Sequence, residues 1–151
     1  PTRRSSDLVQ VYAGTALSAL VPITENGSYY FRVKATKAGY TDSSWKQGTS
    51  GSIVRLVTPA PASLTVPKTN TTGSIALAWG AVKLPDVYYA LEEATTANFS
   101  NAKVVYVGPL VHFTLGGRSN GSYYYRVKAY KMGYADSTWK SGAAACVVTR
   151  P

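Results

Sequence analysis

The chain has 151 residues, of which 45% are hydrophobic and 15% are charged, and its formal net charge is +9 at pH 7. This composition is typical of a globular chain and excludes an intrinsically disordered segment. No run of about 18 apolar residues occurs, so this sequence contains no membrane-spanning helix of its own. Tyrosine at 12 positions and a single methionine favour strands over helices.

The first residues, PTRRSSDL from Pro1 to Leu8, resemble the translation of a widely used sequencing adapter. We expect residues 1–8 to be an assembly artefact and leave them out of the fold prediction. The segment that follows contains two short apolar patterns, and each predicts a short strand: Val11-Tyr12 before Gly14, and then Leu17, Ala19 and Val21.

A long internal repeat dominates the rest of the chain. The stretch NGSYYFRVKATKAGYTDSSWK at 26–46 returns as NGSYYYRVKAYKMGYADSTWK at 120–140, and 18 of 29 positions are identical between 26–54 and 120–148, at an offset of 94. In the second copy, one set of residues alternates with another: Tyr123, Tyr125, Val127 and Ala129 with Tyr124, Arg126, Lys128 and Tyr130. This period of two predicts a strand with one buried face, bounded by turns at Asn-Gly and Gly-Tyr.

The two patterns near the start match Val105-Tyr106 before Gly108 and Val111, Phe113, Leu115 at the same offset. The first copy therefore lacks the front half of the repeating unit. We expect its strands to be loosely supported, because a few strands alone bury too little apolar area. Pro59 and Pro61 predict a short, stiff linker at 58–62. The chain thus divides into a C-terminal half-repeat at 9–58 and a complete repeat at 60–151.

Seven strands are predicted in the second unit from alternation and turn spacing, which is the number typical of an antiparallel sandwich. They are centred on Leu64 and Val66; Ile75, Leu77 and Trp79; Tyr89 and Leu91; Val104 to Val107; Val111, Phe113 and Leu115; Tyr123 to Ala129; and Ala144 to Thr149. We expect Trp79, Tyr89, Leu91, Phe113, Tyr125 and Val127 to form the core.

These residues resemble the fibronectin type III domain, in the form found in tandem arrays on bacterial secreted or surface proteins. The marks are Trp79 in the second strand, Tyr89 two positions after Val87, and the Tyr-x-aromatic-x-Val-x-Ala strand from Tyr123 to Ala129 before a Gly-containing loop. In the family, a Leu-x-Pro-Gly segment leads into the strand that here begins with Tyr123, and in this chain the sequence LGGRSNGS at 115–122 replaces it. The resemblance implies an all-β fold of tandem antiparallel immunoglobulin-like sandwiches, the first of them incomplete.

Enzymatic chemistry is not indicated by the residue types present. One His and one Cys exclude a Ser-His-Asp triad and a zinc site, and neighbouring Glu92 and Glu93 point to opposite faces of a strand, so they cannot work as an acid–base pair. We expect His112 to be an exposed strand residue, and Cys146 to be a small strand filler where the first copy has Ser52. We therefore expect no catalytic residue, no metal ligand and no cofactor.

Two other motifs have alternative interpretations. Asn-x-Ser/Thr triplets at Asn26, Asn70, Asn98 and Asn120 would accept glycans in a secreted eukaryotic protein, but a role in turns is favoured. The repeated Gly-Tyr-x-Asp-Ser-x-Trp loop places Asp42 and Asp136 before a serine. Since calcium needs about six oxygen ligands, we expect Asx-type turns there.

The outward side of the repeated strand is the candidate ligand face. Aromatic and basic groups alternate on it, and we include the tryptophan of the following loop: Tyr124, Arg126, Lys128, Tyr130 and Trp139 in the second copy, and Tyr30, Arg32, Lys34 and Trp45 in the first. Such a face could stack on sugars or pair with anions. In the alternative, Trp139 folds over Arg126 and Lys128 lies near Glu92, so that the charged groups of this face are paired within the domain.

Two functions from different classes remain. One is a non-catalytic structural, spacer or interaction module of a larger extracellular or cell-surface protein, whose partners are the other domains of that protein. The alternative is a module that binds carbohydrate or an anionic cell-surface polymer through the aromatic and basic face. Specific nucleic-acid binding is not expected, because no motif of a known reader is present.

Overall fold

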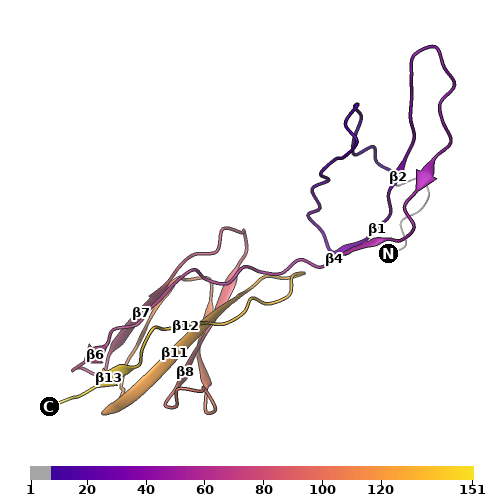
Figure 1. The fold of residues 1–151 in the computed structure, drawn as a ribbon. Helices are drawn as coiled ribbons and strands as arrows, with labels where there is room; N and C mark the ends of the chain where they lie inside the picture. Colours follow the sequence, from indigo (N-terminus) through magenta and orange to yellow (C-terminus); the bar gives the residue numbers. More distant parts are fainter. Residues whose placement is uncertain (1–7) are drawn as a thin grey trace. The chain divides into compact units, whose positions relative to one another are not determined.

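The computed structural model describes residues 8–151, so Pro1–Asp7 of the adapter-like segment lie outside the described residues. Within that range the chain forms thirteen strands and no helix (Figure 1). It divides into two compact units, Pro1–Val54 (unit 1) and Arg55–Pro151 (unit 2). The predicted all-β class is confirmed.

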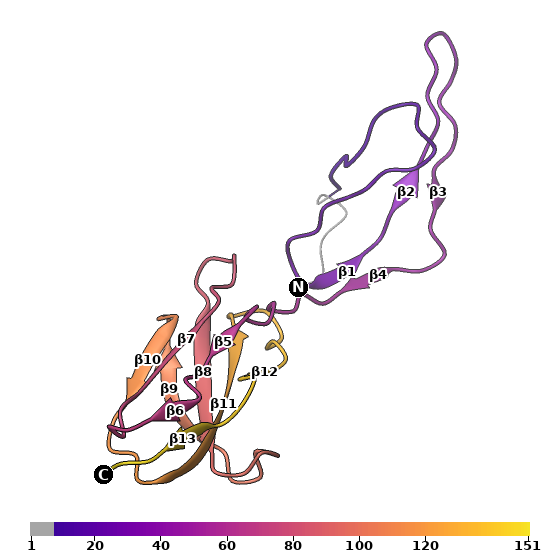
Figure 2. The ribbon, with the colours of Figure 1, turned by 60° about the vertical axis from the view of Figure 1, so that its left-hand side comes forward.

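Unit 2 is built from two sheets. The smaller has the order β10-β7-β5, and the larger has the order β6-β13-β11-β8-β9, with β12 also paired to β11. In both ribbon views the long β11 runs the length of unit 2 (Figures 1 and 2). The strands are β5 (Leu64–Thr65), β6 (Thr69–Asn70), β7 (Ile75–Trp79), β8 (Tyr88–Ala94), β9 (Lys103–Gly108), β10 (His112–Leu115), β11 (Gly121–Tyr130), β12 (Lys140–Ser141) and β13 (Cys146–Val148).

The core of unit 2 follows the period of two. In β7, Ile75, Leu77 and Trp79 are buried, and the alanines between them are exposed. In β11, Tyr125, Val127 and Ala129 are buried, and the residues between them are half-buried. Each strand therefore contributes one apolar face to the space between the sheets. Among the predicted core residues only Phe113 is partly exposed. It lies on β10, an edge strand, and packs against Tyr106 at a ring-centroid distance of 4.8 Å.

All seven predicted segments of unit 2 contain a strand. Two strands were not predicted, β6 and β12, each of only two residues. The pairing is also not wholly antiparallel, because β6 runs parallel to β13 with Val147 opposite Thr69. Both strands consist of polar residues, Thr69–Asn70 and Lys140–Ser141, so neither has the apolar alternation on which the prediction relied.

Unit 1 contains two small antiparallel sheets, one of β1 (Gly27–Tyr29) with β4 (Ser52–Val54) and one of β2 (Arg32–Val33) with β3 (Lys46–Gln47). In Figure 2, β2 and β3 form the base of a long hairpin. No residue from 8 to 54 is buried. The expectation of weakly supported strands is met in this respect.

The two strands predicted at 11–12 and 17–21 do not form, and that prediction was wrong. Their counterparts in unit 2, β9 and β10, are held by pairing with β8 and β7. Unit 1 has no equivalent of those partner strands among its described residues. An isolated apolar alternation without a pairing partner does not make a strand.

Residues expected in the linker pack within unit 2. The Thr58 N–H donates to the Ala135 carbonyl oxygen at 2.9 Å, the Ala135 N–H donates to the Leu56 carbonyl oxygen at 3.0 Å, and both Thr58 and Pro61 are buried. The boundary between the two compact units falls after Val54, whereas the domain boundary predicted from the sequence lies near residue 58. The domain limits 9–58 and 60–151 stay a prediction.

Candidate ligand face on strand β11

Strand β11 lies inside the larger sheet, with β8 on one side and β12 and β13 on the other. This position exposes only one face of the strand to solvent, because the other face covers the core. Tyr124, Arg126, Lys128 and Tyr130 are half-buried on the outward face, as the alternation predicted. The loop between β11 and β12 brings Trp139 onto the same face.

Arg126 is held on three sides. Its Nε and Nη2 atoms both lie 2.7 Å from Glu92 Oε2, and Glu92 stands directly opposite in the β8–β11 register. The guanidinium carbon is 4.5 Å from the ring centroid of Trp139 and 4.6 Å from that of Phe99. The predicted stacking of Trp139 on Arg126 is therefore confirmed, and the cation has little freedom left to bind a ligand.

Lys128 pairs with Asp136 rather than with Glu92, which corrects the predicted partner. Its Nζ is 2.6 Å from Asp136 Oδ2 and 5.2 Å from the Trp139 ring centroid. Glu92 is taken by Arg126 because those two residues are cross-strand neighbours, whereas Lys128 faces Ala90. Asp136 is thus the partner of a strand lysine, and the Asx turn expected there is not what the structure shows.

The same loop is fixed by a serine. Ser137 Oγ accepts the Ala129 N–H at 2.8 Å and donates to the Thr138 carbonyl oxygen at 2.8 Å. The Gly-Tyr-x-Asp-Ser-x-Trp motif therefore docks its loop on β11 through an ion pair, a serine hydrogen bond and a cation–π contact. We call this set of three contacts the loop clamp.

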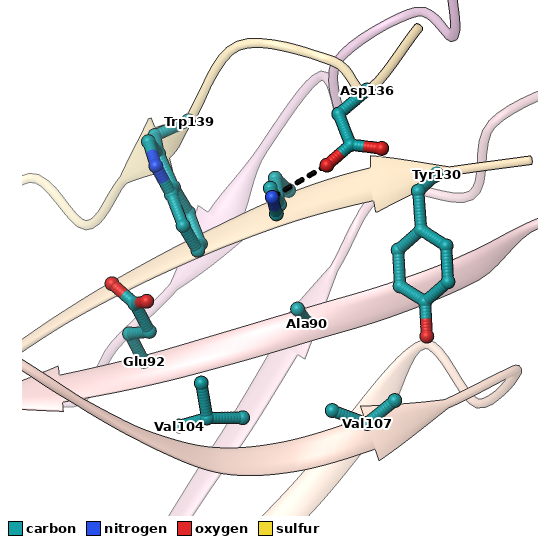
Figure 3. A pocket seen from close by; sticks show the side chains of 8 residues that line it. Ala90, Glu92, Val104, Val107, Tyr130, Asp136 and Trp139 are labelled. Carbon is teal, nitrogen blue, oxygen red and sulfur yellow. Dashed lines mark hydrogen bonds and ion pairs between the residues drawn. The ribbon is translucent and has the colours of Figure 1, made fainter. Parts of the chain in front are cut away.

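A shallow hollow of about 350 Å³ lies beside the clamp (Figure 3). Its floor is aliphatic, with Ala90 on β8 and Val104 and Val107 on β9, and Tyr130 and Trp139 stand on opposite sides of it. Glu92, Asp136 and Lys128 complete the lining. Tyr130 also contacts Tyr88, with ring centroids 6.0 Å apart.

Unit 1 repeats the clamp. Arg32 lies 4.3 Å from the Trp45 ring centroid, Lys34 pairs with Asp42, and Ser43 Oγ accepts the Ala35 N–H at 2.9 Å. The predicted stacking of Trp45 on Arg32 is confirmed. Tyr30 is 78% exposed and is not part of the clamp. The nine predicted face residues thus form two separate sets, one in each unit.

Sequence reasoning missed a polar cluster at the end of the core. Glu93 Oε2 accepts hydrogen bonds from Tyr125 OH at 2.7 Å and from Arg118 Nε at 2.8 Å. Burial and the hydrogen bond to Glu93 raise the pKa of Tyr125 well above its ordinary value, and the same carboxylate raises the pKa of Arg118. Arg118 comes from the Gly-rich segment at 115–122, and no local pattern pointed to its partner.

Tyr123 OH donates to the Ser119 carbonyl oxygen at 3.0 Å. A tyrosine near the start of a strand that bonds back to the backbone a few residues upstream is called a tyrosine corner, and it forms here although the segment before it is LGGRSNGS. Asn120 does not act as a simple turn residue. Its Oδ1 accepts the Arg150 N–H at 2.7 Å, so the side chain ties the start of β11 to the C-terminal end of the chain.

The remaining candidate residues have structural positions. His112 is exposed on β10, and Cys146 is fully buried on β13, where burial raises the pKa of its thiol. No group of three or more His, Cys, Asp or Glu side chains is placed to hold a metal ion anywhere in the described range. The part of the chain that the structure covers also has no helix long and apolar enough to cross a membrane.

Comparison with known proteins identifies the fold. No protein-family model and no curated protein sequence matches this chain. Among solved structures, the chicken CNTN1 FN1–FN3 domains match with a TM-score of 0.51 at 13% identity, over 85% of this chain and 46% of that one. A human fibronectin type III domain from KIAA0970 matches with a TM-score of 0.47 at 18% identity, over 62% and 74% of the two chains.

A chain of a cytokine receptor complex matches with a TM-score of 0.45 at 21% identity, over 54% of this chain and 47% of that one. The present chain therefore spans about half the length of the receptor chain and of the chicken CNTN1 chain. The likeness to the chicken domains extends to the fold alone. The two sheets of unit 2 and the likeness to the chicken CNTN1 FN1–FN3 domains show the fold of an immunoglobulin-like β-sandwich of the fibronectin type III kind.

Proposed function

We propose that this chain is a non-catalytic structural or interaction module of a larger extracellular or cell-surface protein, in which it holds other domains apart. The observation that supports this proposal most directly is the internal pairing of Arg126 and Lys128 on the outward face of unit 2. Both cations of the outward face are already paired with carboxylates and packed on aromatic rings, at 2.7 Å for Arg126 to Glu92 and 2.6 Å for Lys128 to Asp136. Groups that are satisfied within the domain stabilise it and contribute little to recognition of a partner.

The proposal extends to the organisation of the parent protein. We infer a tandem array of fibronectin type III-like repeats of bacterial origin, with a C-terminal half-repeat at 9–58 and a complete repeat at 60–151. The repeated register and repeated clamp of the two units support the repeat organisation.

A second candidate function is carbohydrate binding, and the hollow beside the clamp is the observation that favours it. Aromatic side chains on opposite sides of an aliphatic floor, with two carboxylates in the lining, could stack on a sugar ring and accept its hydroxyl groups. An anionic polymer is less favoured at the same place, since Glu92 and Asp136 neutralise the two cations.

A polysaccharide pull-down separates the two functions. The chain and its double variant Tyr124→Ala/Tyr130→Ala are mixed with insoluble polysaccharides at low and high salt, with Tyr40→Ala as the matched control. Tyr40 is an exposed tyrosine that does not belong to the candidate face. For a spacer we expect equal retention of all three proteins at both salt concentrations.

Salt-resistant retention that the double variant loses and Tyr40→Ala keeps would favour the carbohydrate module. Weak retention that salt abolishes in all three proteins would reflect only the general attraction of a chain with a net charge of +9.

A further inference from the structure

Unit 1 keeps the strand pairing of unit 2, although its described residues, 8–54, form no further sheet to cover that pairing. The pair Gly27↔Val54 in β1–β4 repeats Gly121↔Val148 in β11–β13 at an offset of 94. The pair Val33↔Lys46 in β2–β3 likewise repeats Val127↔Lys140 in β11–β12. The clamp and the tyrosine contact to the residue four positions earlier are also repeated. Strands β1 to β4 of unit 1 therefore already have the pairing that β11, β12 and β13 have inside the complete sandwich of unit 2.

The two units differ in what covers their inner faces. Phe31 and Val33 are 42% and 65% exposed, whereas their counterparts Tyr125 and Val127 are 1% and 0% exposed. In unit 2 these side chains belong to one core with four residues of β5 and β7: Leu64, Ile75, Leu77 and Trp79. All four residues come from the segment 59–102, and unit 1 has no equivalent of that segment among its described residues.

The edge of β2 is open as well. In unit 2, β8 pairs with β11 over seven residues, from Tyr124↔Ala94 to Tyr130↔Tyr88. The equivalent stretch of unit 1, residues 30–36, has β3 on one side, and no strand pairs with its other side within 8–54. An open edge is a template for an added strand.

One charge in unit 1 also lacks its counterpart. Arg126 is paired by Glu92, a residue of β8. Arg32 stacks on Trp45 in the same way, but no carboxylate in residues 8–151 pairs with it. A strand placed at the open edge in the β8 register, with a Glu at the position of Glu92, would bring a carboxylate opposite Arg32.

We propose that the inner face of unit 1, formed by Phe31, Val33 and Val54 with the open edge of β2, is a docking surface for a front half-repeat. Its occupant is a polypeptide segment with the strand spacing and apolar alternation of residues 59–102. One strand, with a Glu at the Glu92 position, pairs with β2, and two strands cover the apolar face as β5 and β7 do. This inference rests on the proposed repeat organisation, in which residues 9–58 are a half-repeat, but not on the choice between spacer and carbohydrate binding, which the polysaccharide pull-down tests separately.

The test inserts a second copy of residues 59–102 directly before Val9 and compares the extended protein with the original chain. Hydrogen exchange is measured for the amides of residues 30–36. We expect exchange to become at least about tenfold slower in the extended protein, because those amides gain strand partners and the face beneath them becomes covered. Unchanged exchange would overturn the proposal.

Two matched substitutions make the result specific. Val33→Asp places a charge on the inner face, and Ile53→Asp places the same charge on a side chain that is 70% exposed and whose counterpart Val147 stays 43% exposed in the complete sandwich. In the extended protein, Val33→Asp should abolish the new protection and Ile53→Asp should preserve it. Equal effects of the two substitutions would show unspecific collapse and would also overturn the proposal.

The charge pairing is tested by changing the inserted copy of Glu92 to Gln. We expect the added protection to be reduced by this change, and to be restored by a second change, Arg32→Gln, which removes the unpaired guanidinium. Protection that is indifferent to both changes would exclude the β8-like register for the docked strand.

Discussion

Trp79 joins the two sheets of unit 2 through its ring. It belongs to β7 in the smaller sheet, and its ring centroid lies 5.9 Å from that of Tyr89 on β8 and 5.8 Å from that of Tyr106 on β9, both in the larger sheet. The side chain is 5% exposed, and its Nε1 atom has no hydrogen-bond partner among the described residues. Its contribution to stability therefore comes from packing.

Replacing Trp79 by Ala should lower the free energy of unfolding of unit 2 by about 3–5 kcal/mol, since it leaves a large cavity between the sheets. Denaturant unfolding followed by circular dichroism measures the loss. Trp139→Ala is the control, because Trp139 is only half-buried and its stacking on Arg126 contributes about 0.5–1 kcal/mol. Equal losses for the two variants would contradict the assignment of Trp79 to the core.

Tyr125 should make the stability of unit 2 depend on alkaline pH. Its pKa in the folded protein lies above the ordinary value of 10.0, because burial and the Glu93 carboxylate both disfavour the phenolate. Below pH 10 the group is protonated in both states and its stabilisation is fully present. As the pH rises above 10 the unfolded chain loses this proton first, so the free energy of unfolding falls by up to about 1.4 kcal/mol per pH unit.

The variant Tyr125→Phe should show a shallower fall in the free energy of unfolding between about pH 10 and 12, because it removes this ionisation. Denaturant titrations at several pH values measure the two slopes. The difference between the slopes isolates Tyr125 from the other tyrosines, which both proteins share. Parallel curves for the two proteins would contradict a raised pKa at this residue.

At the scale of elements, the loop clamp explains why the repeated sequence extends beyond the strand. Three residues of β11 each contact one residue of the motif that follows: Arg126 contacts Trp139, Lys128 contacts Asp136, and Ala129 contacts Ser137. The loop between β11 and β12 is thus fixed by two side chains on the outward face of β11 and by the backbone N–H of Ala129. The repeat keeps both partners of every contact.

Ser137→Ala should destabilise unit 2 by about 1–3 kcal/mol, because it leaves the buried Ala129 N–H without its acceptor. Thermal unfolding measures the effect. The neighbouring Thr138→Ala is the matched control, since Thr138 is exposed and its carbonyl oxygen is kept, and a change within about 0.5 kcal/mol is expected. A similar loss in both variants would mean that the serine hydrogen bond is not what holds the loop.

At the scale of the whole molecule, the two units share a sequence but not a degree of burial. Cys146 is 0% exposed in unit 2, whereas Ser52, its counterpart at the same register position in unit 1, is exposed. The difference follows from the second sheet, which covers the inner face in unit 2. Equivalent positions in the two units therefore differ in their access to solvent.

A thiol reagent should report this difference. Cys146 should react with an aromatic disulfide reagent only as fast as unit 2 opens, because burial hides the sulfur and raises the pKa of the thiol. In the variant Cys146→Ala/Ser52→Cys the same reagent should react at least about tenfold faster under native conditions. Equal rates in denaturant serve as the control, and equal native rates would contradict the exposed inner face of unit 1.

Alternation and the internal repeat were enough to predict the all-β class, seven strands of unit 2, the buried face of β11 and the stacking of Trp139 on Arg126. These features depend on residues close in sequence or on a period that burial imposes on one strand. The ion pairs were harder. Lys128 has acidic candidates on β8 and in the following loop, and only the β8–β11 register, which gives Glu92 to Arg126, decides between them.

Tertiary structure also decided which apolar patterns become strands. The pattern at Val105-Tyr106 forms β9 because β8 pairs with it, while the matching pattern at Val11-Tyr12 stays irregular because no strand within residues 8–151 pairs with it. The contact of Arg118 with Glu93 joins residues 25 positions apart and leaves no trace in local spacing. A strand and an ion pair each need two partners, and a single stretch of sequence contains only one of them.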